Sequence, residues 1–370
     1  MKRNKLIVKT KSKSYSIYFG NNILNSTGVL INKNLPDVKK VCIICDNKVP
    51  TKILKKLVKS LKKYKIKIFK LNANENTKNI LVANKIIEQL LQENFNRSDC
   101  VVALGGGIIG DLSAFISNLT KRGLKFINIP TTLLAQVDAS IGGKTGINAN
   151  LGKNLIGTFY QPDFILSDVS ILKSLPKREM ISGYGEILKH SLILDKQFFL
   201  WLVKNGYKII NRSNDVCLKK AIIKSCKIKS DVVKKDEKEK NLRMILNFGH
   251  TFAHGFESAK NFSNKLKHGE AVLLGMIMAC KLSNKNKLLS FKDLNIIEKH
   301  FTNLRLPMHI SKIFKKNEVK KIVHFMKKDK KNVDKKINLI LLNKIGKANK
   351  PKSFSITVQK MQKFLESFYN

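Results

Sequence analysis

Strand-like and helix-like segments alternate through the first half of the 370-residue chain. The run Val41–Cys45 is apolar throughout and rich in β-branched residues, which is typical of a parallel strand buried on both faces. Alternation of this kind favours an α/β domain with a parallel sheet, in which ligands bind at the carboxyl ends of the strands. We expect strands near 5–9, 15–19, 41–45, 65–71, 100–104, 126–129 and 165–168, and helices near 50–63 and 79–94.

A glycine-rich turn follows the predicted strand at 100–104. Gly105, Gly107 and Gly110 satisfy G-x-G-x-x-G, in which glycines let the backbone approach a pyrophosphate at a helix N-terminus. The usual motif lies in the first βα unit with an acid about 20 residues later, and neither holds here. We therefore predict a dinucleotide site in a modified arrangement, with Asp46 as the candidate for the ribose hydroxyls. The alternative is a glycine turn that serves packing alone.

Hydroxyls, glycines, lysines and an amide are concentrated between residues 130 and 162. The segment includes Thr131, Thr132, Lys144, Lys153 and Asn154. We predict a loop-rich surface that holds anionic oxygens. Gly142-Gly143-Lys144-Thr145 lacks the preceding glycine that a Walker A loop requires.

The second half has a helical pattern. Leu175-Pro176 is a natural boundary, so we predict an α/β domain at 1–176 and an all-α domain at 177–370. Helices are expected near 178–193, 196–204, 214–233, 246–259, 268–282, 291–303 and 316–327.

Three of the seven histidines lie within nineteen residues of this half. His250 and His254 are four apart and share one helical face, and His268 follows. Upstream, Glu186 and Lys189 are three apart on another helix. One carboxylate and two imidazoles form a common catalytic zinc set, so we predict Glu186, His250 and His268 as ligands and His254 as an acid or base. The alternative is that these histidines are packed or exposed residues without a ligand.

The net charge of +45 would ordinarily indicate nucleic acid or an anionic membrane as a partner. Only seven of the 71 basic residues are arginine, and the lysines are spread along the whole chain. Compositional drift explains this pattern more simply, although anionic small substrates would still be attracted. The charged run 231–243, which ends at Arg243, is most simply a solvated face. Lys229 and Arg243 become candidate carboxylate ligands only if the metal site is real.

Six scattered cysteines imply no disulfide framework, which suits a reducing cytosol. Cys42 and Cys45 lie three apart in a predicted strand, where they would point to opposite faces, so a metal or redox pair is not expected. We expect no signal peptide, and the apolar run Ala271–Cys280 is too short to span a bilayer.

Taken together, these motifs resemble those of the 3-dehydroquinate synthase family over nearly the full chain. The blocks that carry the resemblance are Gly105–Asp111, Pro130–Asp138, Ile141–Thr145, Gly152–Asn154, Gly185–Lys189 and Leu246–His254. Singly several are weak, but together they are specific.

The resemblance implies a Rossmann-like NAD-binding domain and a helical domain with a divalent metal (usually zinc, with cobalt possible), with the active site in the cleft between them. It also implies a cytoplasmic homodimer. It places the metal on Glu186, His250 and His268. It places NAD on Asp46, Glu75, Lys78, Gly106, Gly107, Ile108, Ile109, Gly110, Asp111, Thr131, Thr132, Asp138, Lys144, Lys153, Ile171, Leu172, Lys173 and Ser174.

The implied reaction converts 3-deoxy-D-arabino-heptulosonate 7-phosphate to 3-dehydroquinate and phosphate, within the shikimate pathway that leads to chorismate and the aromatic amino acids. Its steps are transient NAD-dependent oxidation at C5, phosphate elimination, re-reduction and aldol cyclisation. Substrate contacts fall on Lys144, Asn154, Lys189, Lys229, Arg243, Asn247 and His254, with Arg122 from a partner subunit and a further contribution from Lys330 or Lys331.

Three alternatives stay open. A related sugar-phosphate cyclase would act on another phosphorylated ketose. A metal-dependent polyol dehydrogenase would release NADH stoichiometrically and would not need a phosphate-binding site. A nucleic-acid-binding protein would bind duplex tightly, with a steep salt dependence.

Overall fold

The computed structural model describes residues 4–261, 263, 265–327 and 336–369. Its contacts divide the chain into two compact units. Unit 1 comprises Met1–Glu179 and Asn214–Lys238, and unit 2 comprises Met180–Ser213 and Glu239–Asn370. Residues 214–238 thus group with unit 1, whereas the sequence pattern had placed them in the second domain. The reason is that α7 (Asp215–Lys235) packs its apolar face on β1, β2 and a short π-helical turn, η3 (Ala135–Ala139).

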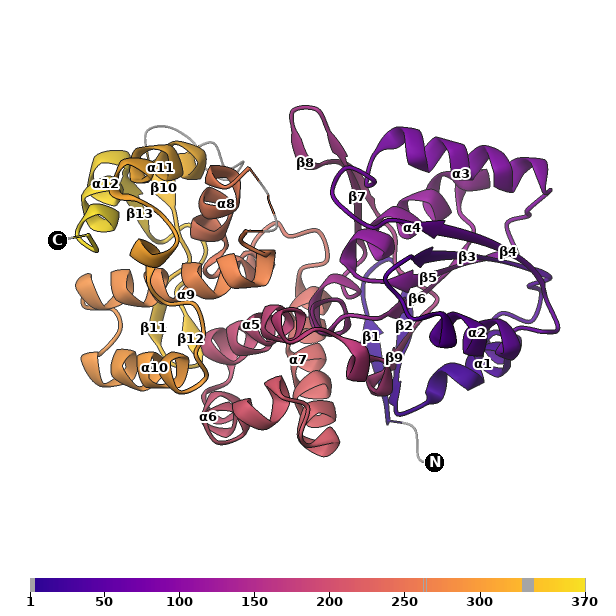
Figure 1. Cartoon of the computed structure of the whole chain (residues 1–370), viewed down its shortest axis with the longest axis horizontal. Helices are drawn as coiled ribbons and strands as arrows, with labels where there is room; N and C mark the ends of the chain where they lie inside the picture. The colour runs from indigo at the N-terminus through magenta and orange to yellow at the C-terminus, as the bar shows by residue number, and fades with distance from the viewer. Residues whose placement is uncertain (1–3, 262, 264, 328–335, 370) are drawn as a thin grey trace. The chain divides into compact units, whose positions relative to one another are not determined.

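A seven-stranded sheet forms the centre of unit 1 (Figure 1). Its order is β1-β2-β9-β6-β5-β3-β4. β1 pairs antiparallel with β2, and the other neighbouring pairs are parallel. All seven strands occur where the apolar runs predicted them: β1 (Asn4–Lys9), β2 (Ser14–Gly20), β3 (Lys40–Asp46), β4 (Lys65–Leu71), β5 (Cys100–Gly105), β6 (Lys125–Pro130) and β9 (Phe164–Asp168).

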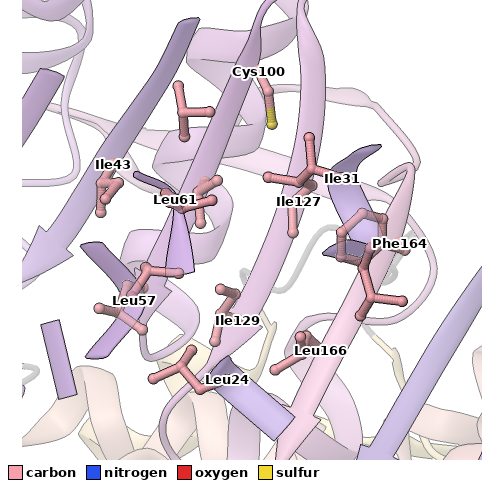
Figure 2. Close-up of a cluster of buried hydrophobic side chains, with 14 of the residues drawn as sticks. Leu24, Ile31, Ile43, Leu57, Leu61, Cys100, Ile127, Ile129, Phe164 and Leu166 are labelled. Atoms are coloured by element: carbon pink, nitrogen blue, oxygen red, sulfur yellow. The ribbon is translucent and has the colours of Figure 1, made fainter. Parts of the chain in front are cut away.

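Helices cover both faces of this sheet, with α1 and α2 on one side and α3 and α4 on the other (Figure 1). Figure 2 shows the core on the α1–α2 side, a cluster to which Leu57, Ile43 and Phe164 all belong. Cys45 belongs to this cluster and Cys42 to the cluster on the opposite face, which confirms their predicted orientation. Besides α7 and η3, the helices of unit 1 are η1 (Ile23–Ser26), α1 (Thr27–Asn34), α2 (Thr51–Ser60), α3 (Ile80–Gln92), α4 (Gly107–Leu119), η2 (Thr120–Arg122) and η4 (Val169–Ser174).

Two further strands, β7 (Lys144–Ala149) and β8 (Gly152–Phe159), form an antiparallel hairpin. The prediction of a loop-rich surface here was wrong. Thr145 pairs with Thr158 across the ladder, with their hydroxyls 2.8 Å apart, and Ile147 pairs with Ile156. These β-branched cross-strand pairs stabilise the hairpin, and the density of glycine concealed them in the sequence.

Unit 2 is mainly helical, as predicted. Its helices are α5 (Lys177–Leu194), which starts at the end of unit 1, then α6 (Lys196–Ile210), η5 (Leu242–Asn247), α8 (His250–Ala259), α9 (His268–Lys285), α10 (Phe291–Asn303), η6 (Ile310–Lys312), η7 (Lys316–Glu318), α11 (Val319–Lys327) and α12 (Val358–Glu366).

Four short strands make the all-α prediction wrong for residues 336–357. β10 (Lys336–Asn338) pairs with β13 (Ser355–Thr357), and β11 (Leu342–Lys344) pairs with β12 (Lys347–Ala348). The turn between β11 and β12 contains Gly346 at φ 83°, a conformation that glycine adopts readily. Across the parts of the chain that the structure describes, no helix combines the length and apolarity needed to cross a membrane.

Candidate functional site

Helix α5 of unit 2 carries a buried ion pair. The Glu186 carboxylate and the Lys189 ammonium lie one helical turn apart and form a salt bridge, and their side chains are 1% and 2% exposed. A charge in such surroundings is costly unless it is paired. Among the described residues, neither oxygen of Glu186 accepts a hydrogen bond of good geometry. The carboxylate therefore has lone pairs available for a further electrophile.

Helix α8 begins at His250. Its N-cap, Gly249, lies in the left-handed region at φ 78°, which starts the helix abruptly. The His250 Nδ1 atom lies 3.3 Å from the Phe248 carbonyl oxygen, and Nε2 lies 3.7 Å from the Glu186 carboxylate. The ring of His254, one turn later, is 5.8 Å from that of His250 between centroids, so the two histidines share a face as predicted.

Helix α9 begins at His268. Glu270 accepts a hydrogen bond from the Lys267 backbone N–H at 2.9 Å and caps the helix. The His268 Nδ1 atom lies 3.2 Å from a carboxylate oxygen of Glu257, on α8. Burial lowers the pKa of His268, but the Glu257 and Glu186 carboxylates outweigh burial and raise it to about 8.

These three helices bring Glu186, His250 and His268 together. One ligand atom from each lies within 4.8 Å of the other two. A tetrahedral zinc with bonds of about 2.0–2.2 Å needs its ligand atoms about 3.3–3.6 Å apart, so a contraction of at most about 1.5 Å would complete the set. The donor set of one carboxylate and two imidazoles, with the unused lone pairs of Glu186, fits a divalent metal with an open position.

Small residues allow this convergence. A Cβ on Gly269 of α9 would lie 2.2 Å from the Ser182 hydroxyl oxygen of α5, and a Cβ on Gly275 would lie 2.2 Å from the Gly249 carbonyl oxygen. Both distances are far inside van der Waals contact. Glycine at 269 therefore lets α9 approach α5, and glycine at 275 lets it approach the start of α8.

In unit 1, the glycine-rich turn joins β5 to α4. Gly106 is the N-cap of α4, so the first backbone N–H groups of this helix are available to an anion. Asp46 ends β3, the neighbouring strand, and Thr131 follows β6 on the other side. The glycines also serve packing, because a Cβ on Gly110 would lie 3.1 Å from the Asn128 amide nitrogen.

Lys78 connects two other predicted residues. Its ammonium lies 2.5 Å from the Asp111 carboxylate and 2.6 Å from the Asn154 side-chain oxygen, and the residue is 4% exposed. Burial raises the pKa of Asp111, and the Lys78 charge offsets part of this effect. Lys78 thus links the N-terminal part of α4 to strand β8.

A second network lies beside it. The Glu75 carboxylate accepts from the Asn148 amide at 2.8 Å and forms an ion pair with Lys153 at 3.0 Å. Burial raises the pKa of Glu75, but the Asn148 hydrogen bond and the Lys153 charge outweigh it, and the pKa is lowered overall. The predicted residues Glu75, Lys78, Asp111, Lys153 and Asn154 therefore form one connected polar region, to which Asn148 is an unpredicted addition.

Asp138 and Lys229 contact each other directly. The Lys229 ammonium lies 2.6 Å from the Asp138 carboxylate and donates to its backbone carbonyl at 2.7 Å. The two were assigned to different ligands, NAD and substrate, so their pairing was not foreseen. Lys229 is 6% exposed, so a substrate would have to compete with Asp138 for its charge.

The remaining predicted residues are distributed as follows. Lys144 is exposed at the start of β7 and lines a small hollow with Gly110, Asp111 and Ser140. Arg122 is exposed on η2 at φ 63°. In η4, Ile171 and Leu172 are buried, whereas Lys173 and Ser174 are exposed. Thr132 caps the turn before η3, and Ile108 and Ile109 lie in α4. Arg243 is buried in η5, and the Asn247 amide donates a hydrogen bond to Glu239 at 2.8 Å. Lys330 and Lys331 lie outside the described residues.

Glu257 and Glu237 are buried acids that had no predicted role. Glu257 contacts His268, and a signal existed in the sequence because Glu257 lies seven residues after His250 and so on the same helical face. Glu237 accepts from Gln161 at 2.8 Å and from the Ser12 backbone at 3.1 Å within unit 1. No local pattern could have indicated the Glu237 contacts, because its partners are distant in the sequence.

Sequence and structural relatives agree on the family. Residues 68–182 match the family model of the 3-dehydroquinate synthase N-terminal region, and residues 183–332 match that of the C-terminal region. A 3-dehydroquinate synthase of Pelagibacter ubique (strain HTCC1062) is 51% identical over 92% of this chain and 93% of its own.

Two solved structures share the fold. A 2-deoxy-scyllo-inosose synthase complexed with carbaglucose-6-phosphate, NAD+ and Co2+ superposes with a TM-score of 0.88 at 24% identity, over 98% of this chain and 100% of the other. A 2-epi-5-epi-valiolone synthase from Streptomyces hygroscopicus with NAD+ and Zn2+ bound gives 0.84 at 23%, over 98% of each chain. The matches to both family models and to the Pelagibacter enzyme show that this chain belongs to the 3-dehydroquinate synthase family.

Proposed function

We propose that this chain is a 3-dehydroquinate synthase, which converts 3-deoxy-D-arabino-heptulosonate 7-phosphate to 3-dehydroquinate and phosphate. The observation that carries the proposal is the convergence of Glu186, His250 and His268 beside the buried ammonium of Lys189, in a chain of this family. A carboxylate and two imidazoles suit a metal that polarises a hydroxyl, and a neighbouring lysine suits a polyhydroxylated anion.

NAD and a divalent metal are the proposed cofactors, with zinc as the first choice and cobalt as the second. NAD+ with Co2+ or Zn2+ in the two structural relatives supports this choice. When bound, NAD would accept and return a hydride while the metal polarises the oxygen at the same carbon. Glu186, His250 and His268 would hold the metal. The open N–H groups at the start of α4 would face the NAD pyrophosphate, and Asp46 would bond the ribose hydroxyls.

The proposed substrate contacts divide by charge. Lys144, Asn154 and His254 would bind the phosphate, with Arg122 contributed by a partner subunit of a homodimer. Lys229 and Arg243 would bind the carboxylate, and Lys189 would lie near the hydroxyls. Asn247 is the remaining residue proposed to contact the substrate.

Several residues have polar partners already, as the contacts of Lys78 with Asn154 and of Asp138 with Lys229 illustrate. When the substrate binds, its hydrogen bonds and ion pairs to these residues would therefore replace the contacts that they make with one another. We also propose that the functional division follows residues 1–176 for NAD and 177–370 for metal and substrate.

A cytoplasmic location is part of the proposal, on the ground that all six cysteines, each within the described ranges, stand outside any disulfide. The only partners required are the small anionic substrate, the cofactors and a second copy of the chain.

The decisive experiment measures phosphate release from 3-deoxy-D-arabino-heptulosonate 7-phosphate by purified protein, with and without NAD and a chelator. We expect release that needs both NAD and metal, proceeds without accumulation of NADH and yields 3-dehydroquinate. His250→Ala should lose bound metal and turnover together, whereas the exposed His309→Ala should retain both.

Other outcomes separate the alternatives. Release from a different phosphorylated ketose alone would indicate a related cyclase, and stoichiometric NADH formed from a polyol would indicate a dehydrogenase. Tight duplex binding that persists near physiological salt would indicate a nucleic-acid-binding protein.

A further inference from the structure

The second nitrogen of each metal-ligand histidine needs a partner. An imidazole that binds a metal through one ring nitrogen usually donates the N–H of the other to a carboxylate or a carbonyl, which fixes the tautomer and the orientation of the ring. In unit 2, His250 has the Phe248 carbonyl oxygen 3.3 Å from Nδ1. His268 has the Glu257 carboxylate 3.2 Å from Nδ1.

Both contacts use Nδ1 and leave Nε2 for a metal. For His250, Nε2 is the atom that faces Glu186, at 3.7 Å. The two histidines therefore have the same arrangement, but one partner is a neutral carbonyl and the other is an acid. A carboxylate partner also raises the basicity of the imidazole, which strengthens it as a ligand.

Glu257 is placed by the helix that carries His250. It lies seven residues after His250, two turns along the same face of α8. The residue is only 7% exposed, so its carboxylate has been removed from water. Burial of an acid on the polar side of a helix is unfavourable unless that acid has a specific partner. The His268 ring supplies one.

We propose that Glu257 is a positioning residue for the metal: it accepts a hydrogen bond from Nδ1 of His268 and so presents Nε2 of that ring to the metal. The proposal rests on the proposed function, because it needs the metal site. Glu257 itself is not a ligand. Its effect is to fix the tautomer and the direction of the His268 ring.

The test compares Glu257→Ala, Glu257→Gln and a control, Glu298→Gln, which removes a carboxylate paired with Lys281 at 3.2 Å elsewhere in unit 2. Zn2+ and Co2+ dissociation constants are measured by chelator competition, and the visible spectrum of the Co2+-loaded protein reports its coordination. Circular dichroism and thermal unfolding of the metal-free proteins establish that each variant folds.

We expect Glu257→Ala to weaken metal binding about 10–100-fold and to alter the Co2+ spectrum. Glu257→Gln, which can still accept the hydrogen bond but lacks the charge, should lose less affinity and keep the spectrum. Glu298→Gln should match the parent protein. If Glu257→Ala does not fold, the metal affinity of the folded Glu257→Gln variant decides the test.

Affinity within twofold of the parent in both Glu257 variants, with tight metal binding by the parent, would overturn this inference and leave the proposed function intact. Failure of the parent protein itself to bind Zn2+ or Co2+ would overturn the metal site, and with it both proposals.

Discussion

Gly275 of α9 lies directly against the backbone carbonyl of Gly249, the residue that precedes His250. A Cβ at 275 would lie 2.2 Å from that carbonyl oxygen. Gly249 lies in the left-handed region and immediately precedes His250, so a shift of its backbone would displace His250. The absence of a side chain at 275 therefore sets how closely α8 approaches α9, and so the distance between His250 and His268.

We predict that Gly275→Ala destabilises the protein by about 1–3 kcal/mol, as is usual when a methyl group is inserted into a filled interior. Metal affinity should fall as well, because α8 must move to relieve the contact. Urea unfolding and chelator competition measure the two effects. Lys285→Ala, at an exposed position of the same helix, is the control. Unchanged stability in Gly275→Ala would mean that α8 and α9 are not closely packed at this point.

The buried pair of Glu186 and Lys189 gives a second prediction. Lys189→Met keeps most of the side-chain volume but leaves the Glu186 charge without its partner. We expect the metal-free protein to lose about 3–5 kcal/mol, the usual cost of breaking a buried ion pair from one side. Saturating Zn2+ should restore part of this loss, because the metal supplies the missing positive charge and binds the folded state preferentially.

Urea unfolding with and without Zn2+ checks this prediction. The same substitution at Lys173, an exposed lysine whose ion pair spans 3.6 Å, should change stability by less than about 1 kcal/mol. A Lys189→Met protein as stable as its parent without metal would mean that the ion pair does not stabilise the folded protein, which would also weaken the assignment of Glu186 as a ligand.

The contact between Lys78 and Asp111 gives a third prediction. Lys78→Met should weaken NAD binding, because removal of the lysine raises the pKa of the buried Asp111 carboxyl further and releases Asn154. Asp111→Asn should also weaken NAD binding. Because the two side chains are in contact, the double variant should lose less free energy than the sum of the single losses.

Isothermal titration of NAD to the parent, both single variants and the double variant completes this cycle. A coupling of about 0.5–3 kcal/mol is expected for residues in one network. Strict additivity would indicate that Lys78 and Asp111 act on the cofactor independently.

The strands of unit 1 could be predicted because a strand buried on both faces has a continuous run of apolar residues, such as that at β3, which is visible in the sequence. The metal ligands could be predicted because residue type and helical spacing are also local. The β7–β8 hairpin was missed because glycines interrupt its apolar pattern, and its cross-strand pairs, such as Thr145 with Thr158, are visible only once the register is known. Propensity at single positions does not carry this information.

Contacts between residues far apart in the sequence could not be predicted. Helix α7 was predicted correctly as a helix, but its grouping with unit 1 depends on contacts with β1 and η3, more than 70 residues away in sequence. The pairing of Asp138 with Lys229 follows from the same packing. Sequence motifs had assigned each residue to a ligand, and only the structure showed that the two are partners.

The last prediction concerns a histidine outside the site. His300 of α10 is 2% exposed, its Nε2 lies 2.7 Å from the Tyr184 hydroxyl, and burial lowers its pKa to about 4. The unfolded chain has an ordinary histidine pKa of about 6.5. Above pH 6.5 neither state is protonated at this residue and its neutral form fits the core. As the pH falls from 6.5 towards 4, the unfolded state binds a proton that the native state does not, so stability is lost.

This difference amounts to about 2 kcal/mol between pH 7.5 and pH 5, at about 1.4 kcal/mol per pH unit below 6.5. His300→Gln removes the titrating group while retaining a polar partner for Tyr184, so its free energy of unfolding should decline less over this interval, by that amount. Urea unfolding of the metal-free protein at the two pH values measures the decline. His324→Gln, at an exposed histidine of α11, is the matched control, and its stability should decline as that of the parent does. Equal declines in the parent and His300→Gln would mean that His300 is protonated, or reaches water, in the folded protein.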